Sequence, residues 1–447
     1  MPPVTAADRR RPGPVSAPAP SRSPRRLRPT RPEVLMSALS PLVALDQDAL
    51  RCPAGAYEEL RAQGVHYAPE IDAYVVARHE DVVRVLRDGR TFSSQNTVGR
   101  LLPPADPSNP KQPLAPLLLL SDDPEHAKRR SIVNRAFTPS KIAAWEPEVR
   151  RLAQDQVDRL RDLPEVDFVR DLAALLPVRV ISMVLGVPPE DVAQFREWSE
   201  EITSSVGNHG GDPVRREQVQ EAFSGYISRV LDQWDGVVDT SVLSQIAAAE
   251  RAGELTRTQC VSFVVELLVA GNITTTHHIS SSIALLARHP GLFDRLAADP
   301  SLIQGFVEES LRLEAPIQGF YRLAMADAEV GGVAIPEGSR LFVLYGSANR
   351  DEKAWPNCPH LELDRPNAAA HLAFGKGAHA CIGSSLARLE GRVVVEVLLD
   401  RLSGFELTAA VDELPYGASF VNHGPVSLPA TLTFRSPAAV DAVGAAR

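Results

Sequence analysis

The chain has 447 residues, 44% of them hydrophobic and 23% charged, with a formal net charge of −9. This is the composition of a globular protein with a large core, and the negative charge argues against general nucleic-acid binding, which needs a basic surface. Four cysteines without paired spacing favour a reducing compartment, and no apolar run reaches the ~20 residues of a membrane span, so we expect no membrane association.

The first part of the chain is not expected to fold. Residues 1–40 are rich in arginine, proline, alanine and serine, and the four prolines between positions 12 and 20 would break a targeting helix. We interpret this segment as a disordered tail, with Met36 as an alternative first residue.

A first group of elements precedes a long connection. Residue periodicity predicts a helix at Ala54–Ala62, a hairpin over Val65–Ala77 and a helix at Asp81–Arg87. Residues 95–120 then form a proline-rich connection that ends in four leucines. A structureless connection of this length inside a domain is usually functional.

The next predicted helix carries two basic side chains on one face. Asp123 and Pro124 suit the N-cap and the first position of a helix. His126 and Arg130 follow four residues apart, so they share a face. Because Lys128 lies nearby, a solvated basic face is one interpretation of this pair. Further helices are predicted up to residue 234, with a glycine-rich hinge at 208–213.

The longest predicted helix runs from a capping box at Thr256–Gln259 to Arg288, about 50 Å at 1.5 Å per residue. Its middle holds the sequence Ala270-Gly-Asn-Ile-Thr274. The Thr274 hydroxyl can donate to the Ala270 carbonyl and open the helix locally. A threonine within a helix is often only polar filler, so this motif is weak evidence alone.

An acid and a base three residues apart, Glu309 and Arg312, occupy the following helix, where a buried pair would need further bonds to offset its desolvation. Strand-like segments come after it, at Phe320–Met325, 329–335, Arg340–Leu344, Phe405–Thr408, Ser419–Asn422 and Thr431–Phe434.

A glycine-punctuated loop leads to a single cysteine. The pattern is Phe374-Gly375-x-Gly377-x-His379-x-Cys381-x-Gly383, and an amphipathic helix follows it. Backbone N–H groups at a helix N-terminus favour a thiolate, and the glycines permit a tight turn and close approach to a flat partner. Such a cysteine is a soft ligand for iron or zinc, a nucleophile, or simply a small buried hydrophobe.

This loop resembles the haem-binding signature of the cytochromes P-450. Six fixed positions at roughly one in twenty each occur by chance at ~10⁻⁸ per starting position. With the long helix and the Glu309–Arg312 pair, the resemblance covers about residues 41–435. It implies a mainly α fold with a small β part, a single haem-containing domain, and a C-terminal tail at 436–447.

The resemblance also implies roles for individual residues. Cys381 would be the thiolate ligand of haem b, which favours O–O cleavage, and Thr274 would deliver protons on the oxygen side. Gly271 would leave room there for a flat cofactor or O₂. Arg365 would join Glu309 and Arg312 as a structural partner. The remaining cofactor-binding residues would be His126, Arg130, Ala270, Arg322, Phe374, Gly375, His379 and Gly383, and the pocket walls would be residues 95–120, Val269, Ile317, Gln318, Phe420 and Val421.

The implied function is a soluble, cytoplasmic bacterial monooxygenase that oxidises a small organic substrate of secondary metabolism. Its electrons would come from NAD(P)H through a ferredoxin reductase and a ferredoxin, which would dock by charge near Lys376, Arg388 and Arg392. Alternatives are a peroxide-driven peroxygenase and a catalytically silent relative acting as a recruitment domain. A cysteine hydrolase lacks a recognisable His–acid arrangement near Cys381.

One position departs from the family pattern. The family usually carries Asp or Glu immediately before the threonine, whereas this chain has Ile273, which cannot exchange a proton. Three accounts remain open: a water chain through Thr274 and His277, a proton donor on the substrate, or a peroxide shortcut. His277 lies near the same helix face as Thr274, and an unperturbed histidine pKa suits a relay. A helix-surface histidine bonded to a neighbour is an equal alternative.

Overall fold

The structure is a computed structural model, and it describes residues 38–95, 117–207 and 213–436. The described residues form one compact unit. Almost all of the two predicted tails, the predicted hinge at 208–213 except Pro213, and most of the 95–120 connection lie outside the described residues. The tail and domain boundaries therefore stay predictions.

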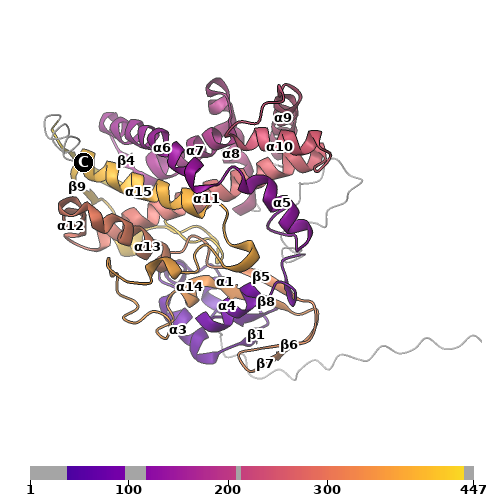
Figure 1. Cartoon of the computed structure of the whole chain (residues 1–447). Helices are drawn as coiled ribbons and strands as arrows, with labels where there is room; N and C mark the ends of the chain where they lie inside the picture. The colour runs from indigo at the N-terminus through magenta and orange to yellow at the C-terminus, as the bar shows by residue number, and fades with distance from the viewer. Residues whose placement is uncertain (1–37, 96–116, 208–212, 437–447) are drawn as a thin grey trace, which may run out of the picture. The chain divides into compact units, whose positions relative to one another are not determined.

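Helices make up most of the described chain (Figure 1), which confirms the predicted mainly α fold. They are α1 (Ser40–Val43), α2 (Gln47–Arg51), α3 (Ala54–Gln63), α4 (His79–Arg87), α5 (Glu125–Asn134), α6 (Pro139–Arg159), α7 (Leu175–Leu185), α8 (Val192–Gly207), α9 (Pro213–Asp232), α10 (Val242–Arg251), α11 (Arg257–Arg288), α12 (Leu292–Ala298), α13 (Ile303–Leu313), α14 (Tyr345–Ala348) and α15 (Ser384–Arg401).

Among the described residues, the strands of the smaller β part form three sheets. The largest has the order β1-β2-β8-β5-β3, in which β2 and β8 are parallel and the other pairs are antiparallel. A second sheet has the order β4-β10-β9, and β6 and β7 form a hairpin. The strands are β1 (His66–Ala68), β2 (Ala73–Val76), β3 (Phe92–Ser93), β4 (Val166–Asp167), β5 (Gly319–Ala324), β6 (Ala328–Val330), β7 (Val333–Ile335), β8 (Arg340–Leu344), β9 (Leu402–Leu407) and β10 (Pro429–Phe434).

Two local predictions were wrong. The predicted strand Ser419–Asn422 makes only one isolated bridge, between Ile317 and Asn422. Its Ser419 hydroxyl accepts the N–H groups of Val421 and Asn422 at 3.2 and 3.0 Å, and this local turn competes with an extended ladder. Helix α5 begins one residue later than predicted, with Pro124 rather than Asp123 at the N-cap, while the Asp123 carboxylate accepts the N–H of Ala127.

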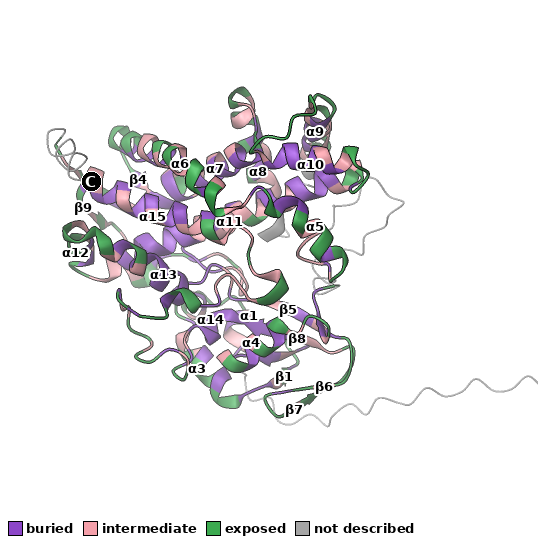
Figure 2. Cartoon of the chain, viewed as in Figure 1, coloured by how far each residue is buried: buried purple, intermediate pink, exposed green. Residues whose placement is uncertain are grey.

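Helix α11 lies at the centre of the helical part. The predicted capping box is present, with the Thr256 and Gln259 side chains each accepting the other's backbone N–H. The helix contacts α7, α8, α13 and α15. By length and hydropathy α11 could cross a membrane, but half of its most apolar window is buried inside the fold. Its apolar character is therefore used for the core, as is that of the largely buried α15 (Figure 2).

The predicted Glu309–Arg312–Arg365 network forms in the interior. Glu309 receives two hydrogen bonds from Arg312, at 2.6 and 2.9 Å, and one from Arg365 at 3.0 Å. The Glu309 and Arg312 side chains are both fully buried. Burial alone would raise the pKa of Glu309, but the hydrogen bonds and charge of Arg312 hold it below its usual value. The carboxylate therefore stays ionised between two guanidinium groups.

We predict that Glu309→Ala lowers the free energy of unfolding by about 3–5 kcal/mol, because it leaves the buried Arg312 guanidinium without a counter-charge, whereas Arg365 keeps its ion pair with Glu362. Glu148→Ala is the matched control, since Glu148 and Arg151 form a pair of the same spacing on the exposed surface. That change should cost about 1 kcal/mol or less. Equal losses for the two variants in denaturant unfolding would contradict a structural role for the buried network.

Candidate functional site

The candidate site is built around the loop that presents Cys381 at the start of α15. The Cys381 N–H donates to the Phe374 carbonyl at 2.9 Å, which closes the loop. Gly377, in a short 3-10 turn, has a φ of +76°, and a Cβ there would lie 2.3 Å from the Leu86 carbonyl at the end of α4. We had expected this glycine to face a flat partner. It instead allows the loop to pack against α4.

The thiol of Cys381 is not activated by the protein alone. Burial among protein atoms raises the pKa of Cys381, while the Gly383 N–H and the charges of Arg130 and Arg388 lower it by less. The helix N-terminus therefore favours the thiolate, as expected, but its effect is smaller than that of burial. Cys381 is nevertheless exposed to solvent as a residue, and a metal ion that it coordinates would deprotonate it outright.

Four basic residues predicted to act together do gather beside this loop. The rings of His126 and His379 are in contact, with centroids 4.1 Å apart and planes tilted by 34°. Arg130 donates to the carbonyls of Ala378 and Ala380 at 3.1 and 2.6 Å, so it braces the loop from α5. Burial, His126 and Arg322 lower the pKa of His379 to about 4. The cluster is therefore rich in N–H donors.

The long helix shows one predicted bond and one correction. Thr274 Oγ1 donates to the Ala270 carbonyl at 2.7 Å, as expected, and Ala270 is exposed although it lies in the middle of a core helix. The position where Gly271 would carry a Cβ faces Ile181 of α7 at 3.5 Å. A side chain at position 271 would therefore point toward α7 rather than toward a cofactor.

The expectation of an unperturbed pKa for His277 was also wrong. Burial and the neighbouring His423 lower the pKa of His277 to about 4, so its imidazole is neutral at ordinary pH. The ring packs against Gly424, where a Cβ would lie 2.6 Å from His277 Nδ1. His423 in turn is held by Glu314 through a 2.6 Å contact.

Four of the residues predicted to line the substrate pocket are accessible, whereas Gln318 is not. Ile317, Phe420 and Val421 are only partly buried, and the Gln318 N–H donates to the Val421 carbonyl at 2.7 Å, so the two segments lie side by side. Val269 on α11 is also partly buried. The side chain of Gln318 does not serve as a wall: its amide bonds the Tyr57 hydroxyl and the Ala315 carbonyl in the interior.

Sequence reasoning missed a carboxylate on α11. Glu266 accepts the N–H groups of Leu117, Leu118 and Leu119 at 2.7, 3.0 and 2.8 Å, which ties the end of the long connection to the central helix. Burial raises the pKa of Glu266 while these three bonds lower it. The signal was visible, since Glu266 is the one acid in a strongly apolar run.

The predicted ferredoxin-docking charges are largely neutralised within the fold. Arg388 makes two hydrogen bonds to Glu308, at 2.7 and 3.0 Å. Arg392 bonds Glu146 and Glu396 at 2.7 and 3.0 Å. Charge reversal at either arginine would therefore disturb internal ion pairs, and the docking hypothesis loses two of its three residues.

Comparison with known proteins identifies the family. The cytochrome P-450 family model matches residues 215–415. The steroid C26-monooxygenase of Mycobacterium tuberculosis is 33% identical over 401 residues, 87% of this chain and 96% of the relative. The P-450 monooxygenase PikC of Streptomyces venezuelae is 33% identical over 397 residues, 87% and 93% of the two chains. A solved P-450 of Chondromyces apiculatus gives a TM-score of 0.78 at 35% identity, covering 88% and 98%. The chain belongs to the cytochromes P-450.

Relatives of this chain are named monooxygenases, and the protein is a P-450 monooxygenase of a family that uses haem iron. The site can be tested for its fit to that group. Among the described residues, the buried Nε2 of His126 has no hydrogen-bond partner, and neither Arg130 nor Arg322 has a carboxylate within 4 Å. Within the described ranges, one buried imidazole nitrogen without a partner and two guanidinium groups without a counter-charge lie beside an exposed cysteine at a helix start. This set suits an anionic, metal-containing cofactor, so the residues fit haem.

Proposed function

We propose that Cys381 is the thiolate ligand of haem b, bound between α11 and the loop that ends at Cys381. The observation that carries this proposal is the presentation of the sulfur. The side chain is exposed at the start of α15, although much of the helix behind it is buried, and the Phe374 carbonyl fixes its backbone. When bound, haem would activate O₂ for insertion of oxygen into, or coupling of, an organic substrate.

The other site residues would bind and orient. His126, Arg130, Arg322 and His379 would donate to the propionates, and Phe374, Gly375 and Gly383 would shape the loop beneath the cofactor. Ala270 would lie on the oxygen side with Thr274, whose hydroxyl donates to the Ala270 carbonyl and would move a proton there. The walls of the substrate pocket would be Val269, Ile317, Phe420 and Val421.

The electrons would come from NAD(P)H through a ferredoxin reductase and a ferredoxin in the bacterial cytoplasm. Lys376 remains from the predicted docking surface, because Arg388 and Arg392 are paired internally. The substrate would be a small organic molecule of secondary metabolism. Two relatives, PikC and the nocardicin C N-oxygenase, the latter 33% identical over 363 residues, support this class but do not identify the compound that this chain oxidises.

Carbon monoxide binding tests the ligand directly. The reduced wild-type protein should give the strongly red-shifted Soret band of a thiolate-ligated haem, because the sulfur pushes electron density onto iron. Cys381→His should abolish that band. Cys358→Ala is the control, since Cys358 contacts Arg312 instead, and it should keep the band. An unshifted band in folded wild-type protein would contradict the assignment.

A second test asks which group supplies protons, given that Ile273 cannot. We propose that polar groups of the substrate complete the relay, since Ile273 cannot and His277 is held neutral against Gly424. Ile273→Glu should then raise O₂ consumption without product on foreign substrates and leave turnover of a well-coupled substrate within about twofold. The measurement is product formed per NADPH consumed with a ferredoxin system.

His277→Phe separates the competing accounts in the same assay. It should leave the ratio of product to NADPH unchanged if the substrate supplies the proton, and it should lower that ratio if His277 relays it. If Ile273→Glu accelerates turnover of the well-coupled substrate many-fold, Ile273 simply limits proton delivery, and the proposal that the substrate supplies the proton is wrong. Turnover with hydrogen peroxide at the rate of the ferredoxin system would favour the peroxygenase alternative.

A further inference from the structure

A buried ion cluster lies next to the cysteine loop, and the proposed function gives it no role. Glu308 of α13 accepts two hydrogen bonds from Arg388 of α15, at 2.7 and 3.0 Å. The Gln304 amide also donates to Glu308, at 3.0 Å, and Nε2 of His371 lies 3.2 Å from Glu308 Oε2. The Glu308 side chain is only 6% exposed. Three segments that are distant in sequence thus meet at one carboxylate.

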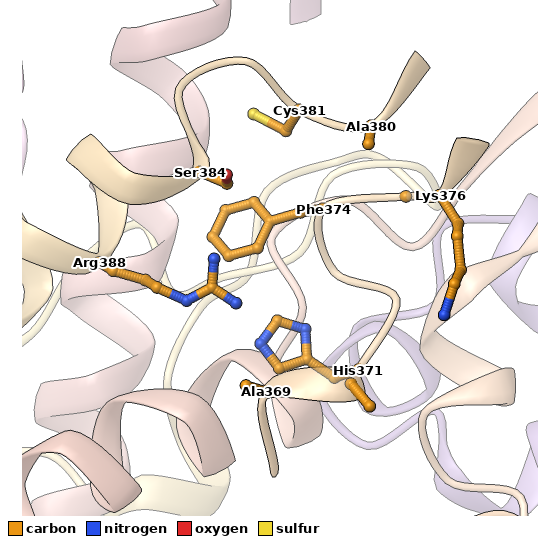
Figure 3. A pocket seen from close by; sticks show the side chains of 10 residues that line it. Ala369, His371, Phe374, Lys376, Ala380, Cys381, Ser384 and Arg388 are labelled. Atoms are coloured by element: carbon orange, nitrogen blue, oxygen red, sulfur yellow. The ribbon is translucent and has the colours of Figure 1, made fainter. Parts of the chain in front are cut away.

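This cluster is in contact with the residue that fixes Cys381. The Arg388 guanidinium carbon lies 4.5 Å from the centroid of the Phe374 ring, and the His371 ring lies 5.6 Å from it. Phe374 in turn accepts the Cys381 N–H. His371, Phe374, Cys381 and Arg388 all line one cavity of about 180 Å³ (Figure 3). The close-up shows Arg388 and His371 on the side of Phe374 away from Cys381, with Lys376 pointing elsewhere.

The charges of the cluster cancel at neutral pH. Burial would raise the pKa of Glu308, but His371 and Arg388 lower it to about 2, so the carboxylate is ionised. Burial lowers the pKa of His371 despite the pull of Glu308, and the charges of Arg388 and of Arg312 on α13 lower it further. From α11, His278 has a pKa lowered to about 4 by its own burial. One negative and one positive charge remain.

We propose that the Glu308–Arg388–His371 cluster sets the reduction potential of the haem bound through Cys381, with Glu308 cancelling the charge that Arg388 places on the face of Phe374. The proposal rests on Cys381 being the iron ligand. Reduction adds one negative charge to the site, so an uncompensated cation nearby stabilises the reduced state and an uncompensated anion destabilises it. The three side chains act as positioning residues, through Phe374 and the sulfur rather than on the substrate.

Spectroelectrochemical titration of the purified haem protein tests this with three variants. Glu308→Gln frees the Arg388 charge, so the equilibrium constant for reduction should rise roughly tenfold, or about 59 mV for one electron. Arg388→Gln frees the Glu308 charge and should shift the potential in the opposite direction. Arg392→Gln is the matched control, because Arg392 lies one turn along α15, is equally exposed, and pairs with Glu146 and Glu396.

The Arg388→Gln variant carries a second signature. Removing the Arg388 charge raises the pKa of His371, which is then protonated at low pH and neutral at high pH. Protonated His371 compensates Glu308, so the potential of this variant should fall as pH rises through that pKa, whereas the wild type should stay flat near neutral pH. Adding His371→Phe to Arg388→Gln should remove the slope.

The outcomes separate the two proposals. A wild type without the thiolate-type carbon monoxide band would overturn the assignment of Cys381, and this inference with it. If the band is present but Glu308→Gln and Arg388→Gln shift the potential no more than Arg392→Gln does, only the cluster's role is wrong. If Glu308→Gln does not fold, the reduction potential of Arg388→Gln and its dependence on pH test the proposal alone. The Arg388 side chain is 25% exposed, so its replacement disturbs the core less than replacement of Glu308 does.

Discussion

Buried charge on α13 holds the irregular segment that carries Cys381. Between Asn349 and Cys381 the chain forms only short 3-10 turns, so its backbone groups must find partners outside regular helix or sheet. Arg312 donates to the carbonyls of Asn349 and His360, and Glu309 accepts the N–H of Glu362. The Asn349 side chain then accepts the N–H of Leu372 at 2.6 Å, directly before the cysteine loop. A desolvated ion pair, which is a poor source of stability by itself, here supplies the bonds that position a ligand loop.

Much of this arrangement could be predicted from sequence because the signals are local. The capping box at Thr256, the spacing of Glu309 and Arg312, and the glycine-punctuated cysteine loop depend on residues a few positions apart, and each is present as expected. The errors concern what a side chain meets across the fold. Gly271 faces Ile181, Gln318 turns to Tyr57, and Arg388 pairs with Glu308, 80 residues away. No periodicity encodes such partners, and a local serine turn was enough to prevent the strand expected at Ser419–Asn422.

The distal and proximal sides of the site differ in how they handle charge. On α11, Thr274 follows Ile273, and the histidine three residues further on, His277, is neutral, so the chain supplies little acidity there. Beside the cysteine loop, charges are abundant but paired, and a single substitution would leave one of them uncompensated against Phe374. This asymmetry agrees with the two proposals above, in which the substrate supplies the proton on the α11 side and the paired charges beside the cysteine loop set the reduction potential.

Iron K-edge X-ray absorption tests the central claim, that Cys381 binds the metal, most directly. The ferric wild-type protein should show one sulfur scatterer bound to iron, which should be lost in Cys381→Ala and kept in Cys260→Ala and Cys358→Ala. Iron ligated only by nitrogen and oxygen in the wild type, or a sulfur signal that survives in Cys381→Ala, would contradict the account.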